Sequence, residues 1–122
     1  MNYNFQYSFS DEVASKYDCD YLNKQLEIYF SGFTDLFNNK YYESHCKFII
    51  REWENAKIKL DGESEFVEFE SNNSPISMIY SIVQNGNSVE LFVNTIDNRY
   101  YTIYYIVRYH IEYCICLCIS AI

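Results

Sequence analysis

Apolar residues recur at steps of three and four along the first quarter of the chain. They are Val13, Tyr17, Tyr21, Leu22, Leu26, Tyr29, Phe30 and Phe33. The polar residues Asp18, Lys24 and Glu27 fall between them, which is typical of an amphipathic helix. Ser10 can cap this helix and Gly32 can end it. The pattern therefore predicts an N-terminal helix from Ser10 to about Gly32.

The next segment, from Phe33 to Ser44, has a weaker pattern. It fits a short second helix around Leu36 and Phe37, followed by a polar loop.

Residues Cys46 to Leu60 fit either a helix or two strands, because their apolar positions satisfy both periods. The β-branched residues Ile49, Ile50 and Ile58 favour two strands. The turn signal Asp61-Gly62 directly after the segment supports the same choice.

Turn signals and alternating apolar residues predict further strands. Glu65 to Glu70 is interpreted as a strand with Val67 and Phe69 facing inward. Ile76 to Val83 and Ser88 to Thr95 flank Asn85-Gly86, a pair that favours a type I′ hairpin turn. Asp97-Asn98 marks the next turn.

The C-terminal quarter alternates apolar residues with a second set of side chains from Tyr101 to Ile119, which predicts a strand. Twenty residues at ~3.3 Å each would span roughly 65 Å, whereas a globule of this size has a radius of gyration near ~14 Å. We therefore expect this strand to bend, bulge or break near Arg108 to His110. The predicted fold class is α+β, with the N-terminal helix packed on a mostly antiparallel β-sheet that has a long bent C-terminal strand.

Composition narrows the class of protein. The chain has 122 residues, of which 49% are hydrophobic and 20% aromatic, which fits a single domain over residues 1–122 with its own core. Seventeen acidic residues against nine basic ones give a formal net charge of −8. This charge disfavours direct nucleic-acid binding and favours a basic protein partner.

The N-terminal residues 1–10 lack the basic and apolar regions of a secretory signal, so we expect a cytoplasmic protein. The five cysteines, an odd number, suit reduced thiols. The last twenty residues are apolar, but Arg108, His110 and Glu112 argue against a membrane span. We therefore expect no membrane partner.

Three groups of residues could form a metal-binding or catalytic site, but for each of them we favour a structural role. Cys114, Cys116 and Cys118 could bind a metal, but neighbours on one strand face lie about 6.6 Å apart, which is too far to share one zinc ion. We favour small buried residues there.

Arg108, His110 and Glu112 share one strand face, where His110 could act as a general base oriented by Glu112. An ion-pair stripe or one side of a binding surface is the favoured interpretation. A Cys/His dyad of His45-Cys46, or of Cys46 with His110, is more remote. No phosphate-binding loop, zinc-protease motif or nucleophile elbow occurs, so we expect neither an enzyme nor a cofactor or metal site.

An acidic run follows the predicted strand pair. It comprises Asp61, Glu63, Glu65, Glu68 and Glu70. Together with Glu52, Trp53 and Glu54, these residues are the predicted partner-binding set. The alternative is a solvated face that guards a strand edge.

Tyrosines are the second feature of the composition that points to recognition. The chain has fourteen of them, and tyrosine is enriched in recognition surfaces. Tyr41, Tyr42, Tyr100 and Tyr104 are the candidates for exposure.

The stretch Phe48-Ile-Ile-Arg-Glu-Trp53 leading into Ala56-Lys-Ile-Lys-Leu60, with the small size and acidity of the chain, resembles the small immunity proteins of bacterial polymorphic or contact-dependent toxin systems. The resemblance covers about fifteen residues and transfers no site residue. It implies a cytosolic protein that binds and blocks one cognate toxin, often a nuclease with a basic active-site cleft. The alternatives are a phage-encoded acidic inhibitor that mimics nucleic acid, and a small enzyme or ligand-binding domain built on Arg108, His110 and Glu112.

Overall fold

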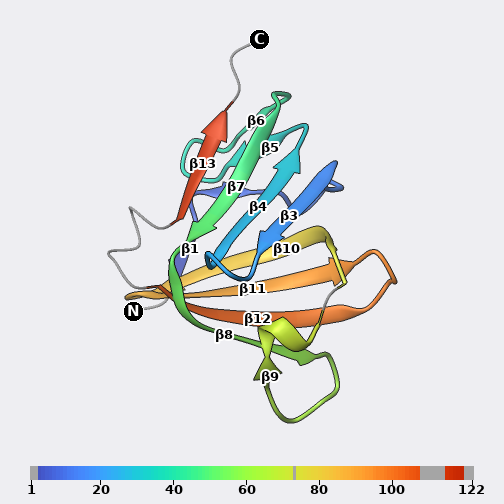
Figure 1. Cartoon of the computed structure of the whole chain (residues 1–122). Coiled ribbons are helices and arrows are strands. Elements are labelled where there is room, and N and C mark those ends of the chain that lie inside the picture. The colour runs from blue at the N-terminus through green and yellow to red at the C-terminus, as the bar shows by residue number, and fades with distance from the viewer. Residues whose placement is uncertain (1–2, 73, 108–114, 120–122) are drawn as a thin grey trace.

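The computed structural model describes residues 3–72, 74–107 and 115–119. These residues form three antiparallel β-sheets and one short 3-10 helix (Figure 1). The six-stranded sheet contains, in spatial order, β1 (Tyr3–Asn4), β10 (Ile76–Asn85), β11 (Ser88–Thr95), β12 (Tyr100–Val107), β8 (Trp53–Leu60) and β9 (Val67–Glu68). The four-stranded sheet contains β13 (Ile115–Ile119), β7 (Cys46–Arg51), β4 (Gln25–Phe30) and β3 (Lys16–Asp20). The three-stranded sheet contains β2 (Tyr7–Ser8), β5 (Phe33–Asp35) and β6 (Lys40–Tyr42), and the 3-10 helix η1 is Phe69–Ser71.

The predicted N-terminal helix is wrong, because its residues form the hairpin β3–β4. Leu26, Ile28 and Phe30 are all buried at every second position of β4, so the period that decides burial is two. Leu22, which the helical pattern placed on the apolar face, is 90% exposed in the turn. The predicted α+β fold class is therefore wrong, and the fold is nearly all β. A second β-sheet, and not the predicted helix, packs on the six-stranded sheet (Figure 1). The prediction of antiparallel β-sheet is confirmed.

The predicted second helix is also wrong, because Leu36 and Phe37 lie in the turn of the β5–β6 hairpin. The Asp35 carboxylate organises this turn by accepting hydrogen bonds from the backbone N–H groups of Phe37 (3.0 Å) and Asn38 (3.3 Å). Asn39 has a φ of +52°, a conformation that asparagine tolerates better than most residues. Local side-chain hydrogen bonds thus favour a turn over a helix here.

The interpretation of Cys46 to Leu60 as two strands is confirmed. The chain changes sheets between them at Glu52, which has a φ of +54°. In Figure 1, β7 runs directly into β8 around this corner, and the strands of the two sheets run across each other. Strands that switch sheets at a corner in this way are typical of orthogonal sheet packing.

The two described ends of the predicted C-terminal strand belong to different sheets, so it is not one straight strand in a single sheet. β12 ends at Val107 and pairs with β8, whereas β13 begins at Ile115 and pairs with β7. The expected position of the break, Arg108 to His110, lies outside the described residues.

The predicted hairpin after Pro75 is confirmed, with Asn85 paired to Ser88 across its turn. The turn type is different from the predicted type I′. Gly86 has a φ of +61°, and Asn87 is not among the residues with positive φ. This combination matches type II′, in which only the first central residue needs positive φ. The turn at Asp97-Asn98 is confirmed, with Asn98 at a φ of +60°.

The core lies between the two larger sheets. Inward-facing residues of both sheets form one hydrophobic cluster together with residues of the N-terminal segment. Phe9 of that segment stacks on Phe30 of β4, with ring centroids 4.4 Å apart. At the corner, Trp53, Phe69 and Tyr105 pack on one another with centroid distances of 5.3 to 5.7 Å. Phe69 therefore anchors η1, and the loop before it, to the core.

Candidate functional site

The predicted acidic run forms one exposed segment, residues 61–70, which we call the acidic loop. It follows β8, contributes the two-residue edge strand β9, and ends in η1. Every residue in it is exposed except Phe69. The prediction that Glu65 to Glu70 forms a longer strand with Val67 facing inward is only partly right, because Val67 is 55% exposed. The segment is therefore mostly loop.

The carboxylates of the acidic loop differ in how far lysines balance them. Glu70 forms an ion pair with Lys24 at 3.3 Å, and Glu68 lies opposite Lys57 in the β8–β9 register. Asp61, Glu63 and Glu65 have no ion pair within the part of the chain that the structure describes. Glu68 also forms no ion pair among the described residues, so Glu70 alone of the five carboxylates is paired with a lysine there.

Glu63 and Glu65 line a hollow of about 350 Å³, which we call the acidic hollow. Its lining residues are Ile58, Leu60, Glu63, Ser64, Glu65, Val67, Ser71, Asn72 and Tyr101. Aliphatic side chains thus face the hollow from β8 and β9, and acidic and hydroxyl groups face it from the loop. Such a combination suits a ligand with an apolar stem and a cationic end.

The far wall of the acidic hollow is held to the other sheet. The Tyr21 hydroxyl donates a 3.0 Å hydrogen bond to the carbonyl oxygen of Asn72, and its ring packs 5.4 Å from that of Phe69. Burial raises the pKa of Tyr21 to about 12. The hydroxyl is therefore protonated, and able to donate, over the whole physiological pH range.

The remaining predicted binding residues lie at the corner between β7 and β8. Glu52 and Glu54 are exposed and line a second hollow of about 410 Å³ together with Lys24. Trp53 lines this hollow too but is 3% exposed and packs in the core. Its main role is therefore structural. The predicted set is thus only partly brought together, because Asp61, Glu68 and Glu70 line neither of these two hollows.

The predicted exposed tyrosines form two groups. Tyr41 and Tyr42 are exposed on β6, and Tyr100 is 40% exposed on β12. Tyr104 is only half-buried. Tyr100 lies on the outer face of the six-stranded sheet, where its ring stacks with those of Tyr80 and Phe92 at 5.9 and 6.1 Å.

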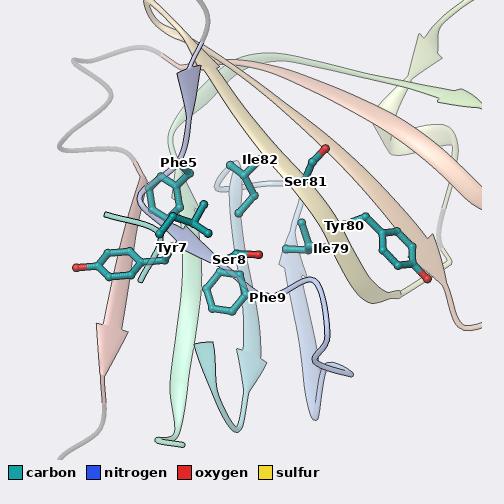
Figure 2. A pocket seen from close by; sticks show the side chains of 9 residues that line it. Phe5, Tyr7, Ser8, Phe9, Ile79, Tyr80, Ser81 and Ile82 are labelled. Atoms are coloured by element: carbon teal, nitrogen blue, oxygen red, sulfur yellow. The ribbon is translucent and has the colours of Figure 1, made fainter. Parts of the chain in front are cut away.

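A third hollow lies between the N-terminal segment and β10. It measures about 140 Å³ and is lined by Phe5, Tyr7, Ser8, Phe9, Leu36, Ile79, Tyr80, Ser81 and Ile82. Figure 2 shows the Ile79 and Ile82 side chains directed toward the rings of Phe5 and Phe9, with Tyr80 on the other side of β10. No titratable side chain other than tyrosine lines this hollow. Its lining therefore contains no carboxylate, histidine or lysine that could act as a general acid or base.

The described residues give little support for a catalytic role of the histidine and cysteine candidates. His45 is exposed, whereas Cys46 is buried with its thiol 3.8 Å from the carbonyl oxygens of Phe30 and Gly32. Burial raises the pKa of the Cys46 thiol to about 11, so it is not an activated nucleophile. Arg108, His110, Glu112 and Cys114 lie outside the described residues.

Cys116 and Cys118 belong to β13, and only their backbone is described. Among the side chains that the structure describes, no three His, Cys, Asp or Glu residues are grouped to hold a metal ion. The described residues likewise contain no helix long and apolar enough to cross a membrane.

Sequence reasoning missed Tyr101 and the aliphatic wall of the acidic hollow. The alternation in β12 placed Tyr101 on the inward face, but it carried no sign that the acidic loop would fold back over this end of the sheet.

Comparisons with protein-family models, curated proteins and solved structures found no match. A functional conclusion must therefore come from the chain's own residues.

Proposed function

We propose that this protein is an immunity protein that neutralises a cognate toxin, and that the acidic loop binds over a basic active-site cleft of that toxin. The observation that carries the proposal is the exposure of Asp61, Glu63 and Glu65 in one segment without balancing ion pairs. Carboxylates placed in this way can occupy the positions at which a nuclease binds substrate phosphates. Occupation of those positions excludes the substrate.

Apolar groups beside these carboxylates support a protein partner. Phe66 and Val67 are 42% and 55% exposed in the same loop. Lys59 lies over the Phe66 ring at 5.4 Å, and the ring is still partly exposed to solvent. Interfaces gain most of their binding energy from such buried apolar and aromatic contacts, while charges contribute specificity and association rate.

The net charge of −8 supports the same class of partner. A negative field accelerates association with a basic surface, and salt weakens this effect. Binding that depends on ionic strength is therefore an expected property of the complex.

The test compares charge reversals at two places. The double variant Glu63→Lys/Glu65→Lys changes the acidic loop, and Glu43→Lys changes an exposed carboxylate just after β6. Proteins captured by the wild type from its native host are identified by mass spectrometry, and each candidate toxin is then co-expressed with each variant. We expect growth to be protected by the wild type and by Glu43→Lys, and protection to be lost with the double variant.

Two results would contradict the proposal. One is equal protection by the double variant and the wild type. The other is an affinity for the captured toxin that is the same for both proteins at low and high salt, because binding over a basic cleft requires the loop charges.

A further inference from the structure

We propose that β3 is an open sheet edge to which an extended segment of a partner protein adds a further strand, with a lysine or arginine side chain beside Asp18. This inference goes beyond the proposed function, because it concerns a different surface from the acidic loop and is tested without a toxin. Two observations carry it. One is the unpaired outer edge of β3 in the part of the chain that the structure describes, and the other is a pair of carboxylates that face each other across β3 and β4.

The backbone of β3 is available on the side away from β4. β3 is the last strand of the four-stranded sheet and pairs only with β4, from Lys16 to Asp20 (Figure 1). Outside this ladder, residues 16–20 make no backbone hydrogen bond to the other described residues. Alternate residues of a strand direct their N–H and C=O groups to opposite sides, so the outer edge of β3 presents free donors and acceptors. These groups are the ones that an added strand engages.

Few structural features protect this edge from an incoming strand. Proteins commonly protect exposed edges with bulges, prolines, charges or covering segments. The five residues of β3 contain no proline, and their register with β4 is continuous. The segment after η1 is bonded beyond both ends of β3, where Tyr21 donates to the Asn72 carbonyl and the Ala14 N–H donates to the Ser77 carbonyl at 2.7 Å. The charges on β3 therefore determine which strand can pair there.

The like-charge pair determines the charge of the occupant. Asp18 lies directly opposite Glu27 in the β3–β4 register, and like charges in this relation destabilise a sheet. Lys47 on β7 forms an ion pair with Glu27 at 3.5 Å, but Asp18 has no ion pair among the described residues. Lys47 thus balances the pair from the β7 side. A cation on a strand added beside β3 would balance it from the other side.

The inward face determines the apolar positions of the occupant. Tyr17 and Cys19 pack against the core but remain partly exposed. The residues opposite them on β4, Ile28 and Leu26, are both 0% exposed. The difference arises because β4 has a paired strand on each side and β3 has one on a single side. Apolar residues on an added strand would cover the exposed parts of Tyr17 and Cys19. The occupant is therefore a strand that alternates basic and apolar residues.

A second copy of the chain is a poorer occupant of this edge. Its own β3 carries two carboxylates, Asp18 and Asp20, against the single lysine Lys16. Each copy also has a net charge of −8. Pairing through β3 would therefore join two edges of like charge.

The experiment uses the full-length protein and synthetic pentapeptides with blocked ends. A peptide that alternates lysine with valine is titrated into ¹⁵N-labelled protein, and the amide chemical shifts are followed by NMR. One control alternates glutamate with valine, and a second is the lysine peptide N-methylated at every interior residue. N-methylation keeps the charges and the side chains but removes the backbone donors. We expect saturable shifts at Tyr17, Asp18 and Cys19 with the unmodified lysine peptide only, with a Kd on the order of millimolar for so small a ligand.

A charge reversal then tests the role of Asp18. We expect Asp18→Lys to weaken binding of the lysine peptide about three- to tenfold and to allow binding of the glutamate peptide. This variant should fold as the wild type does, because the new lysine lies opposite Glu27. Glu43→Lys reverses an exposed carboxylate outside β3 and is the matched control. It should bind the lysine peptide as the wild type does.

Three results would overturn the inference. The first is equal binding of the N-methylated and unmodified lysine peptides, since strand addition requires the backbone donors. The second is an unchanged affinity for the lysine peptide in folded Asp18→Lys. The third is a free protein that sediments as a dimer and becomes monomeric in Asp18→Lys, because the edge would then be occupied by a second copy.

Discussion

The hydroxyl of Tyr21 on one sheet donates a 3.0 Å hydrogen bond to the carbonyl oxygen of Asn72, which lies in the loop that leads to the other sheet. The ion pair between Lys24 and Glu70 at 3.3 Å joins the same two regions. The turn after β3 thus secures the end of the acidic loop. An exposed ion pair contributes little, so the hydrogen bond and the Phe69 ring account for most of the attachment.

Removal of the Tyr21 hydroxyl should loosen the acidic loop. We expect Tyr21→Phe to lower the free energy of unfolding by about 1 kcal/mol, because the Asn72 carbonyl loses its donor while the ring contact with Phe69 remains. Urea denaturation measures the loss, and hydrogen exchange should be faster in the segment after η1. Tyr42→Phe is the control and should leave both quantities unchanged. Equal exchange in the two variants would show that the hydrogen bond does not hold the loop.

The two phenylalanines of the acidic loop should differ strongly in their contribution to stability. Phe69 is 2% exposed and packs on Trp53 and Tyr105, whereas Phe66 is 42% exposed. We expect Phe69→Ala to lower the free energy of unfolding by about 3–5 kcal/mol through loss of packing. Phe66→Ala should change it by less than about 0.5 kcal/mol. Similar losses in the two variants would contradict this assignment of the loop.

Strands with dense local signals could be predicted from the sequence. The β10–β11 hairpin follows from alternating β-branched residues on both sides of Asn85-Gly86, and β7 and β8 follow from β-branched residues before Asp61-Gly62. In these segments the period of the apolar residues and the turn signals predict the same strands. The hairpin turn type was not predictable, because the paired strands place Gly86 first and Asn87 second in the loop.

The N-terminal region was predicted incorrectly because two periods fit the same residues. Leu22, Leu26 and Tyr29 satisfy a helical step, while Leu26, Ile28 and Phe30 satisfy a strand step. The structure buries the second set, because a strand paired between β3 and β7 can place all three in the core. The competing sheet lies far along the chain, so a local pattern could not reveal it.

The candidate site was only partly predictable for a similar reason. Exposure of Glu63 and Glu65 follows from their charge, but their position beside Tyr101 depends on the return of the loop onto β8. That return is set by Phe69, which the local alternation treats as one more strand residue. The burial of Trp53 has the same origin, since its aromatic neighbours lie in other segments.

At alkaline pH, the exposed contact between Glu12 and Tyr41 should be measurable. The Tyr41 hydroxyl donates a 2.5 Å hydrogen bond to Glu12, and this bond, assisted by burial and nearby charge, raises the pKa of Tyr41 to about 12. Because the pKa is raised in the folded state, the contribution to stability is present below about pH 10 and is lost between about pH 10 and 12. We expect Glu12→Gln to return the pKa toward 10 in an NMR titration of Tyr41.

A second variant checks this assignment. A Cβ atom on Gly32 would overlap both the Tyr41 hydroxyl and the Glu12 carboxylate. Gly32→Ala should therefore separate the pair and lower the pKa of Tyr41 as well. A Tyr41 pKa near 12 in both variants would mean that Glu12 is not its cause.

At acidic pH, the turn between β5 and β6 should lose its carboxylate contribution. Burial opposes ionisation of Asp35, but hydrogen bonds from Asn38, Gln6 and the Phe37 N–H outweigh it and lower the pKa. A carboxyl whose pKa is lowered on folding stabilises the protein above its unfolded value of about 3.9, and this stabilisation disappears as the pH falls through the lower folded value. Asp35→Asn should therefore be less stable than the wild type at neutral pH, and the difference should shrink as the pH is lowered toward 3.

Urea denaturation at pH 7, 5 and 3 measures this convergence. Asp61→Asn is the matched control, because no side-chain hydrogen bond to Asp61 occurs in the part of the chain that is described. Its stability should follow that of the wild type at all three values. A constant difference between Asp35→Asn and the wild type at all three pH values would instead mean that ionisation of Asp35 is not linked to folding.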